Sequence, residues 1–217
     1  MSDPFNGPRR RPSIRSWIVG HAVAAVALLV SATSASAEAI PARFLAEGGE
    51  AKPTRAWAQF CAEQPDECKV NMFDRKVIAY TEQFWRDLVT VNVGVNREIT
   101  AITDLEQWGV TDRWDYPDNG MGDCEDIQLE KRRRLAAMGY PARAMRMAVV
   151  VNQEGEGHAV LIVRSDRGDF VLDNRVDAVL PWYRVRYHWV KRESDDGMSW
   201  VALGVASAPV ETAGNGK

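Results

Sequence analysis

The spacing of apolar residues changes near residue 144, and this change constrains the fold more than any other feature of the chain. Before it, apolar residues between Asp74 and Ile102 recur at intervals of three and four, which predicts a helix, although Gly94 argues against an unbroken one. A shorter helix capped by Thr54 should precede it. After it, the period falls to two, which predicts strands over 144–151, 158–164, 170–172, 185–192 and 199–204. Helices followed by antiparallel strands indicate an α+β fold.

A further helix should begin at Cys124. Asp123 is a favourable N-cap, and Gly139 with Pro141 should end the helix. The preceding segment, 103–122, combines aromatic residues with Gly, Pro, Asp and Asn, which predicts an ordered loop leading to the start of this helix.

The N-terminal segment has the layout of a secretory signal peptide. Four arginines, at 9, 10, 11 and 15, precede an apolar run from Trp17 to Val30, and Ala35-Ser36-Ala37 supplies an A-x-A cleavage site. An uncleaved anchor is the alternative. Pro12 directly follows the arginines, which favours general secretion over twin-arginine export. The sequence therefore predicts a signal peptide at 1–37 and a single periplasmic domain at 38–217.

Charge and cysteine usage limit the classes of partner and the redox chemistry. Residues 1–37 carry four of the 27 basic residues and one of the 30 acidic residues, so 38–217 keeps 23 and 29. This acidic balance argues against a nucleic-acid partner. Export favours disulfides, and the short polar loop around Pro65 predicts a Cys61–Cys68 bridge, with two free thiols as the alternative. The third cysteine, Cys124, is then unpaired.

Three short segments supply the residue types of a catalytic triad. They are Gly122-Asp123-Cys124-Glu125-Asp126, Gly157-His158-Ala159 and Leu172-Asp173-Asn174. A cysteine at a helix N-terminus can act as a nucleophile, a histidine can carry the proton, and a carboxylate can orient the imidazole. We therefore predict Cys124 as nucleophile, His158 as base and Asp173 as orienting group. His188 is the rival base, Asn174 could replace Asp173, and turn formation would equally explain the Asp-Asn pair.

The surroundings of Cys124 raise two further possibilities. The Cys124 backbone N–H at the helix start is a natural oxyanion-hole donor. Trp114 or Tyr116 could supply a second donor. The alternative is that both side chains only pack in the core. Carboxylates beside the thiol should raise the pKa of Cys124. Clustered carboxylates also suit a cation such as calcium. The alternative explanation for these carboxylates is that they cap the helix and compensate its dipole. One free thiol without a suitably placed second histidine makes zinc a poor fit. No motif indicates an organic cofactor.

At these residues the chain resembles the bacterial transglutaminase-like cysteine proteinases. The resemblance runs from about residue 92 to 182 and includes Asp104-Leu105-Glu106-Gln107-Trp108-Gly109, Trp114 with Pro117, the Gly-Asp-Cys-Glu-Asp run, the end of the following helix, His158-Ala159-Val160 and Leu172-Asp173-Asn174. It implies a papain-like, transglutaminase-type fold with the triad Cys124, His158 and Asp173.

The resemblance also implies a metal and partners. An adhesin-releasing periplasmic member of the family binds calcium through acidic residues matching Asp123 and Glu125, and its activity depends on calcium. That member cleaves a dialanine-containing site in a large surface adhesin, and an inner-membrane receptor that senses a cyclic dinucleotide sequesters it.

The expected function is therefore an exported, monomeric cysteine endopeptidase. A transglutaminase or amidase would use the same triad, because only the acceptor of the acyl group differs. A calcium-dependent binding module with a vestigial site, or a purely structural exported domain, are the non-enzymatic alternatives.

Overall fold

The computed structural model describes residues 42–203. The predicted signal peptide, its cleavage site and the last residue of the predicted 199–204 strand lie outside this range. Between residues 42 and 203, no helix combines the length and apolar character needed to cross a bilayer.

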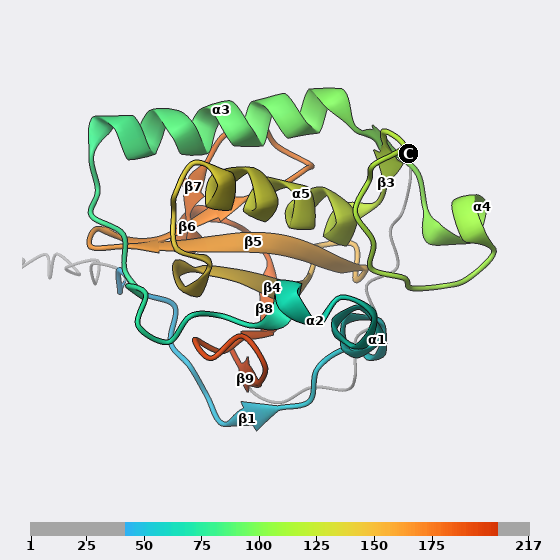
Figure 1. The fold of residues 1–217 in the computed structure, drawn as a ribbon, viewed down its shortest axis with the longest axis horizontal. Helices are drawn as coiled ribbons and strands as arrows, with labels where there is room; N and C mark the ends of the chain where they lie inside the picture. The colour runs from blue at the N-terminus through green and yellow to red at the C-terminus, as the bar shows by residue number, and fades with distance from the viewer. Residues whose placement is uncertain (1–41, 204–217) are drawn as a thin grey trace, which may run out of the picture. The chain divides into compact units, whose positions relative to one another are not determined.

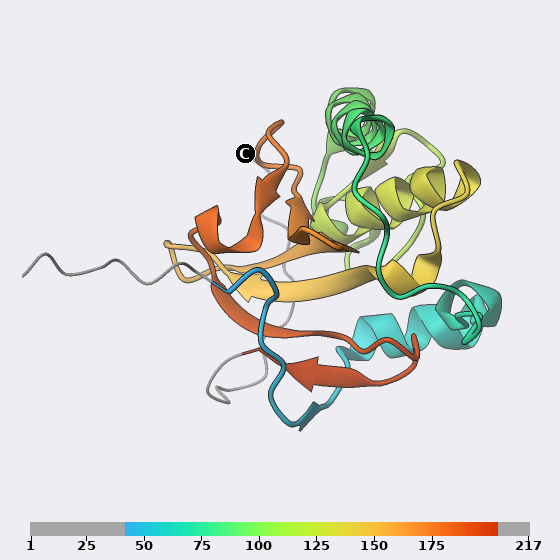
Figure 2. The same cartoon turned by 90° about the vertical axis from the view of Figure 1, so that its left-hand side faces the viewer.

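The described residues form an antiparallel sheet covered on one face by two long helices (Figures 1 and 2). Seven strands pair in the order β1-β9-β8-β4-β5-β6-β7. Their bounds are β1 Glu50–Ala51, β4 Met145–Val151, β5 Gly157–Ser165, β6 Gly168–Leu172, β7 Leu180–Pro181, β8 His188–Glu193 and β9 Trp200–Ala202. The helices over the sheet are α3 Glu82–Glu98 and α5 Cys124–Ala137. This arrangement confirms the α+β prediction.

Smaller elements complete the fold. Two short helices, α1 Arg55–Glu63 and α2 Pro65–Cys68, precede α3, and α4 Asp104–Trp108 lies between α3 and α5. Strands β2 Thr100–Ala101 and β3 Met121–Gly122 form a separate parallel pair. One-turn 3-10 helices cover Ala142–Ala144 and Trp182–Arg184.

The predicted boundaries of the first long helix were wrong at its start. Thr81 caps α3 by accepting a hydrogen bond from the Phe84 N–H at 3.0 Å, so the helix begins at Glu82 rather than near residue 74. Ile78 instead bridges to Ser165 at the end of β5, which holds the preceding segment in extended form. The helix continues through Gly94 without a break.

The loop predicted for residues 103–122 contains a helix that the sequence analysis missed. Thr103 and Glu106 form a reciprocal capping box at the start of α4, and Gly109 ends the helix with a φ of 72°. The Thr-x-x-Glu spacing was the sequence signal for this start. Helix α4 matters for the site because its first residue is a buried aspartate.

Apolar side chains pack on both faces of the central strands. One cluster fills the space between the sheet and helices α3 and α5, and a second covers the opposite face; the second comprises Leu45, Ala148, Val150, Val160, Ile162, Val171 and Trp189. Strands β4 and β5 are therefore buried on both faces and contain nearly continuous apolar runs rather than strict alternation. This two-sided burial fixes β5, which carries a predicted site residue at its start.

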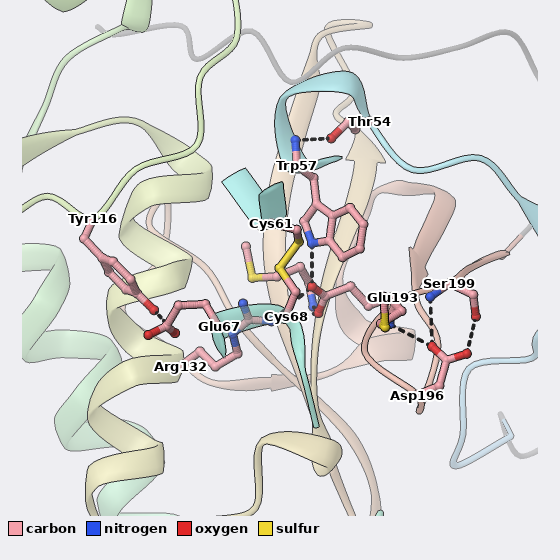
Figure 3. Close-up of a disulfide and its surroundings, with 12 residues drawn as sticks. Thr54, Trp57, Cys61, Glu67, Cys68, Tyr116, Arg132, Glu193, Asp196 and Ser199 are labelled. Carbon is pink, nitrogen blue, oxygen red and sulfur yellow. Dashed lines mark hydrogen bonds and ion pairs between the residues drawn. A yellow bond between two sulfur atoms is a disulfide. The ribbon is translucent and has the colours of Figure 1, made fainter. Parts of the chain in front are cut away.

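The predicted Cys61–Cys68 disulfide is present and joins α1 to α2 (Figure 3). Its two Cα atoms lie 5.6 Å apart. Next to the bridge, the Glu67 carboxylate accepts a hydrogen bond from the Tyr116 hydroxyl. The disulfide loop is thereby attached to the segment that leads into α5.

Candidate active site

Cys124 is the first residue of α5, as predicted, and it is buried against the start of β5. Gly122 permits the close approach of the preceding chain, because a Cβ at this position would lie 2.8 Å from the Cβ of Asp126. Asp123 occupies the N-cap position, but its side chain makes no capping hydrogen bond. Helix capping therefore does not explain this carboxylate.

The Cys124 thiol makes two hydrogen bonds in the described structure. It donates to Oε2 of Glu125 at 3.0 Å and accepts from the Ala159 backbone N–H at 3.4 Å. The second bond places the sulfur beside the residue that follows His158. Burial and the neighbouring Asp123 carboxylate raise the pKa of Cys124 to about 12. With the carboxylates uncompensated, the thiol form is favoured over the thiolate.

His158 and Asp173 meet directly in the buried interior. Nε2 of His158 lies 2.9 Å from Oδ1 of Asp173, and both side chains are almost completely buried. Leu161 pairs with Leu172, so the two residues are not directly opposed in the sheet, and the side chains meet just beyond the end of β6. Because Nε2 faces the carboxylate, Nδ1 is the ring nitrogen left for proton transfer with a nucleophile.

Asp173 has further donors that fix its carboxylate. Tyr187 donates its hydroxyl to Oδ2 at 2.6 Å, and the Arg175 N–H donates to Oδ1 at 2.9 Å. Although burial disfavours the charge, the hydrogen bonds from His158, Arg175 and Tyr187 hold the pKa of Asp173 below its ordinary value. The carboxylate therefore stays ionised and can orient the imidazole.

Two asparagines on α3 hold the backbone of Asp173, and neither was predicted as a site residue from the sequence. Oδ1 of Asn92 accepts from the Asp173 N–H at 3.1 Å, and Nδ2 of Asn96 donates to the Asp173 carbonyl at 3.0 Å. Asn92 is fully buried on the apolar side of its helix. A polar residue within an apolar stripe was the available signal for this role.

The rival residues lie elsewhere. His188 is exposed on β8 and pairs with Val151 at the end of β4. Asn174 accepts a hydrogen bond from Nε2 of Gln128 at 3.3 Å, whereas Asp173 contacts the imidazole. Within residues 42–203, the histidine that meets a carboxylate is therefore His158.

The proposed second oxyanion-hole donors are placed in packed surroundings. The Trp114 ring is buried, with its centroid 6.4 Å from that of Trp200. The Tyr116 hydroxyl is bonded to Glu67, and its ring lies under the Arg133 guanidinium. Tyr116 is thus already engaged through its hydroxyl, and the roles of Trp114 and of the Cys124 backbone N–H stay predictions.

Five carboxylates gather beside the cysteine. The group comprises Asp104, Asp112, Asp123, Glu125 and Asp126, hereafter the acidic cluster, and subsets of three place one oxygen each within 4.8 Å of one another. Only Asp123 and Glu125 were predicted as metal ligands. Asp104 is the first residue of α4, and Asp112 lies in the segment between α4 and β3. Folding rather than sequence proximity therefore brings both to the site.

Burial and mutual repulsion make this cluster unfavourable when fully ionised. Burial and nearby carboxylates raise the pKa of Asp123 to about 8 and that of Asp126 to about 9. Both oxygens of Asp123 and Oε1 of Glu125 are buried and lack hydrogen-bond partners among the described residues. Buried carboxylate oxygens without donors are the ligand type that a hard cation such as calcium requires, so the cluster fits such an ion.

Comparisons with known proteins place this chain in a family. The family model of the bacterial transglutaminase-like cysteine proteinases matches residues 47–208. Comparison with curated protein sequences gave no significant match.

Among solved structures, calcium-bound LapG of Legionella pneumophila aligns with a TM-score of 0.48 at 21% identity, covering 73% of this chain and 85% of that one. A further LapG structure gives a TM-score of 0.44 at 21% identity, with 66% and 76% covered. The family match spans about three quarters of the sequence. The protein therefore belongs to the bacterial transglutaminase-like cysteine proteinases and is a cysteine-type peptidase.

Proposed function

We propose that this peptidase is an endopeptidase that acts through a Cys124–His158–Asp173 triad. The observation that carries the proposal is the buried His158–Asp173 contact of 2.9 Å, next to a cysteine that accepts a hydrogen bond from the Ala159 N–H. These contacts bring together segments of α5, of β5 and after β6 that carry the functional groups needed for acyl transfer.

The reaction follows from the roles of these groups. The Cys124 sulfur attacks the carbonyl carbon of the scissile peptide bond, and the proton from the thiol passes to Nδ1 of His158. The imidazolium then protonates the leaving amine, which breaks the C–N bond and leaves an acyl-enzyme. Water, deprotonated by His158, hydrolyses the thioester and regenerates the thiol. Asp173 keeps the imidazole oriented throughout, and the Cys124 backbone N–H stabilises the oxyanion.

We further propose that the acidic cluster holds calcium. Asp123 and Glu125 supply ligands, joined by Asp104, Asp112 and Asp126, which together offer the oxygen-rich environment calcium prefers. Bound calcium would supply positive charge beside the thiol and offset the carboxylates that raise the pKa of Cys124. LapG of L. pneumophila has been solved with calcium bound.

The proposed setting is the periplasm, reached through cleavage of the 1–37 signal peptide. The proposed substrate is a periplasmic or surface protein, with a large adhesin as the specific candidate from the family resemblance. An inner-membrane receptor would regulate a monomeric enzyme. General secretion is the expected export route.

The experiment that tests this function is cleavage of a candidate adhesin segment by the wild type and by Cys124→Ala in the presence of calcium. The proposal requires cleavage by the wild type and none by the variant. Equal cleavage by both proteins would contradict it. Incorporation of a labelled amine into a glutamine-containing protein would favour the transglutaminase alternative, and calcium-dependent capture without cleavage would favour a binding module.

A further inference from the structure

Three arginines lie together on the sheet face opposite α3 and α5. Arg146, Arg164 and Arg192 come from β4, β5 and β8, which are adjacent strands (Figure 1). The register pairs Arg146 with Ile162 and Arg192 with Ala148. Directly paired residues and residues two apart share a face, so all three arginines lie on the face of the second apolar cluster.

This group is remote from the candidate active site. Arg164 lies six residues along β5 from His158, which corresponds to about 20 Å at the usual rise of a strand. The arginines line a small pocket together with Lys76, Arg143 and Asp195. We call this the arginine pocket. It uses none of the residues assigned to the triad or the acidic cluster.

Two of the guanidinium groups are deeply buried without full hydrogen bonding. Arg146 is 3% exposed and Arg192 is 2% exposed. The Nε of each is buried and has no hydrogen-bond partner among the described residues. A buried donor on a charged group costs free energy when it lacks an acceptor, so these atoms indicate a missing partner.

The local charges leave positive charge uncompensated. Asp169 pairs with Arg164 at 2.8 Å, and Glu47 pairs with Arg192 and more distantly with Arg164. Asp195 lies 3.5 Å from both Lys76 and Arg143. Five cationic side chains therefore meet three carboxylates.

Arg146 is the cation without a partner. Its Nη1 donates only to the backbone carbonyls of Ala142 and Met145, at 3.2 and 3.4 Å, and no carboxylate among residues 42–203 forms an ion pair with it. Burial lowers the pKa of Arg146 to about 10; Glu193 and Asp195 attract the charge from outside ion-pair distance, while Arg192 and Arg164 repel it, and the group remains charged near neutral pH. A buried, charged guanidinium without a counter-ion calls for an anion.

We propose that the arginine pocket binds a compact phosphate-type oxyanion. An excess of two positive charges matches a phosphate dianion, and guanidinium groups present planar donors that suit phosphate oxygens. The cavity among these side chains measures about 10 Å³, which holds about one oxygen atom or water. The ligand is therefore a small anion or a single terminal phosphate group, with its remaining oxygens toward Lys76 and Arg143 at the rim.

Isothermal titration of the purified protein with inorganic phosphate tests this site. The buffer contains EGTA, so that calcium phosphate does not form, and chloride at matched ionic strength provides the reference. Saturable one-to-one binding is expected for phosphate and not for chloride. Comparable binding of glycerol 3-phosphate would identify a phosphate group on a larger molecule as the ligand, and binding of inorganic phosphate alone would identify the free anion.

Variants locate the binding. Arg146→Met should weaken phosphate binding about 10-fold or more, because charge-assisted hydrogen bonds are lost. Lys76→Glu reverses a charge on a side chain that is 62% exposed, so it should weaken binding without disturbing the core. Arg55→Met, at an exposed position on α1, is the matched control and should bind as the wild type does. Heats no larger than those with chloride, or phosphate binding left unchanged by Arg146→Met and Lys76→Glu, would overturn the proposal.

Discussion

Glu193 joins elements around the disulfide through a buried set of hydrogen bonds (Figure 3). Its carboxylate accepts from Nε1 of Trp57 at 2.8 Å, from Nη1 of Arg132 at 2.8 and 3.1 Å, and from the Met147 N–H at 2.8 Å. The side chains of Glu193 and Arg132 are only 3% and 10% exposed. One carboxylate thus connects α1, α5, β4 and β8.

We expect Glu193→Gln to destabilise the protein strongly. The amide keeps the size of the side chain but removes the charge, which leaves the buried Arg132 guanidinium without its ion-pair partner. Removing one partner of a buried ion pair costs about 3 to 5 kcal/mol. For a chain of this size, each kcal/mol corresponds to about 2 to 4 °C, so the unfolding temperature should fall by about 6 to 20 °C.

Urea unfolding followed by tryptophan fluorescence and circular dichroism measures this loss. Glu82→Gln is the control, because Glu82 pairs with Arg86 at 3.5 Å on the exposed face of α3 and should contribute at most about 0.5 kcal/mol. The double variant Glu193→Gln with Arg132→Met should recover part of the loss, since it removes the unpaired charge. A loss for Glu193→Gln no larger than that for Glu82→Gln would show that this buried ion pair does not stabilise the fold.

Three further predictions concern the triad, the disulfide and the acidic cluster. In a peptide-cleavage assay, Asp173→Ala should lower kcat/KM by about 10² to 10⁴-fold, while Asn174→Ala should have little effect. Equal losses in the two variants would count against Asp173 as the orienting group. Replacing Cys61 and Cys68 by serine should lower the free energy of unfolding by about 2 to 3 kcal/mol, and an unchanged urea midpoint would contradict this. Burial and neighbouring carboxylates raise the pKa of Asp123 from 3.8 to about 8. The folded state therefore binds more protons than the unfolded state between about pH 4 and 8, so in EGTA the unfolding temperature should fall as pH rises, and calcium should flatten this slope. A slope that calcium leaves unchanged would argue against calcium binding.

Local signals predicted much of the fold. Thr54 caps α1, α5 begins at Cys124, and the period-two segments became β4, β5 and β6 because these features depend on nearby residues. The start of α3 was mispredicted because the apolar pattern before Thr81 serves a bridge at Ile78 to the end of β5. That contact depends on a distant part of the chain.

In the candidate active site, too, features set by nearby residues were predicted and those set by distant contacts were not. Cys124, His158 and Asp173 lie in recognisable short motifs, and the structure brings His158 to Asp173. Asp104, at the start of α4, and Asp112, between α4 and β3, join the acidic cluster only through folding of this segment. Arg146 belongs to a strand that is otherwise buried and apolar, so no local pattern indicated the arginine pocket there.

The most direct test of a Cys124–His158 catalytic pair is the pH dependence of Cys124 alkylation, measured with and without calcium in the wild type and in His158→Ala. Without calcium, the raised pKa of Cys124 predicts slow labelling. With calcium bound, we expect fast labelling of Cys124 below the usual thiol pKa of about 8.5, and this labelling should slow in His158→Ala. Slow labelling in the wild type that neither calcium nor His158→Ala changes would contradict a Cys124–His158 catalytic pair.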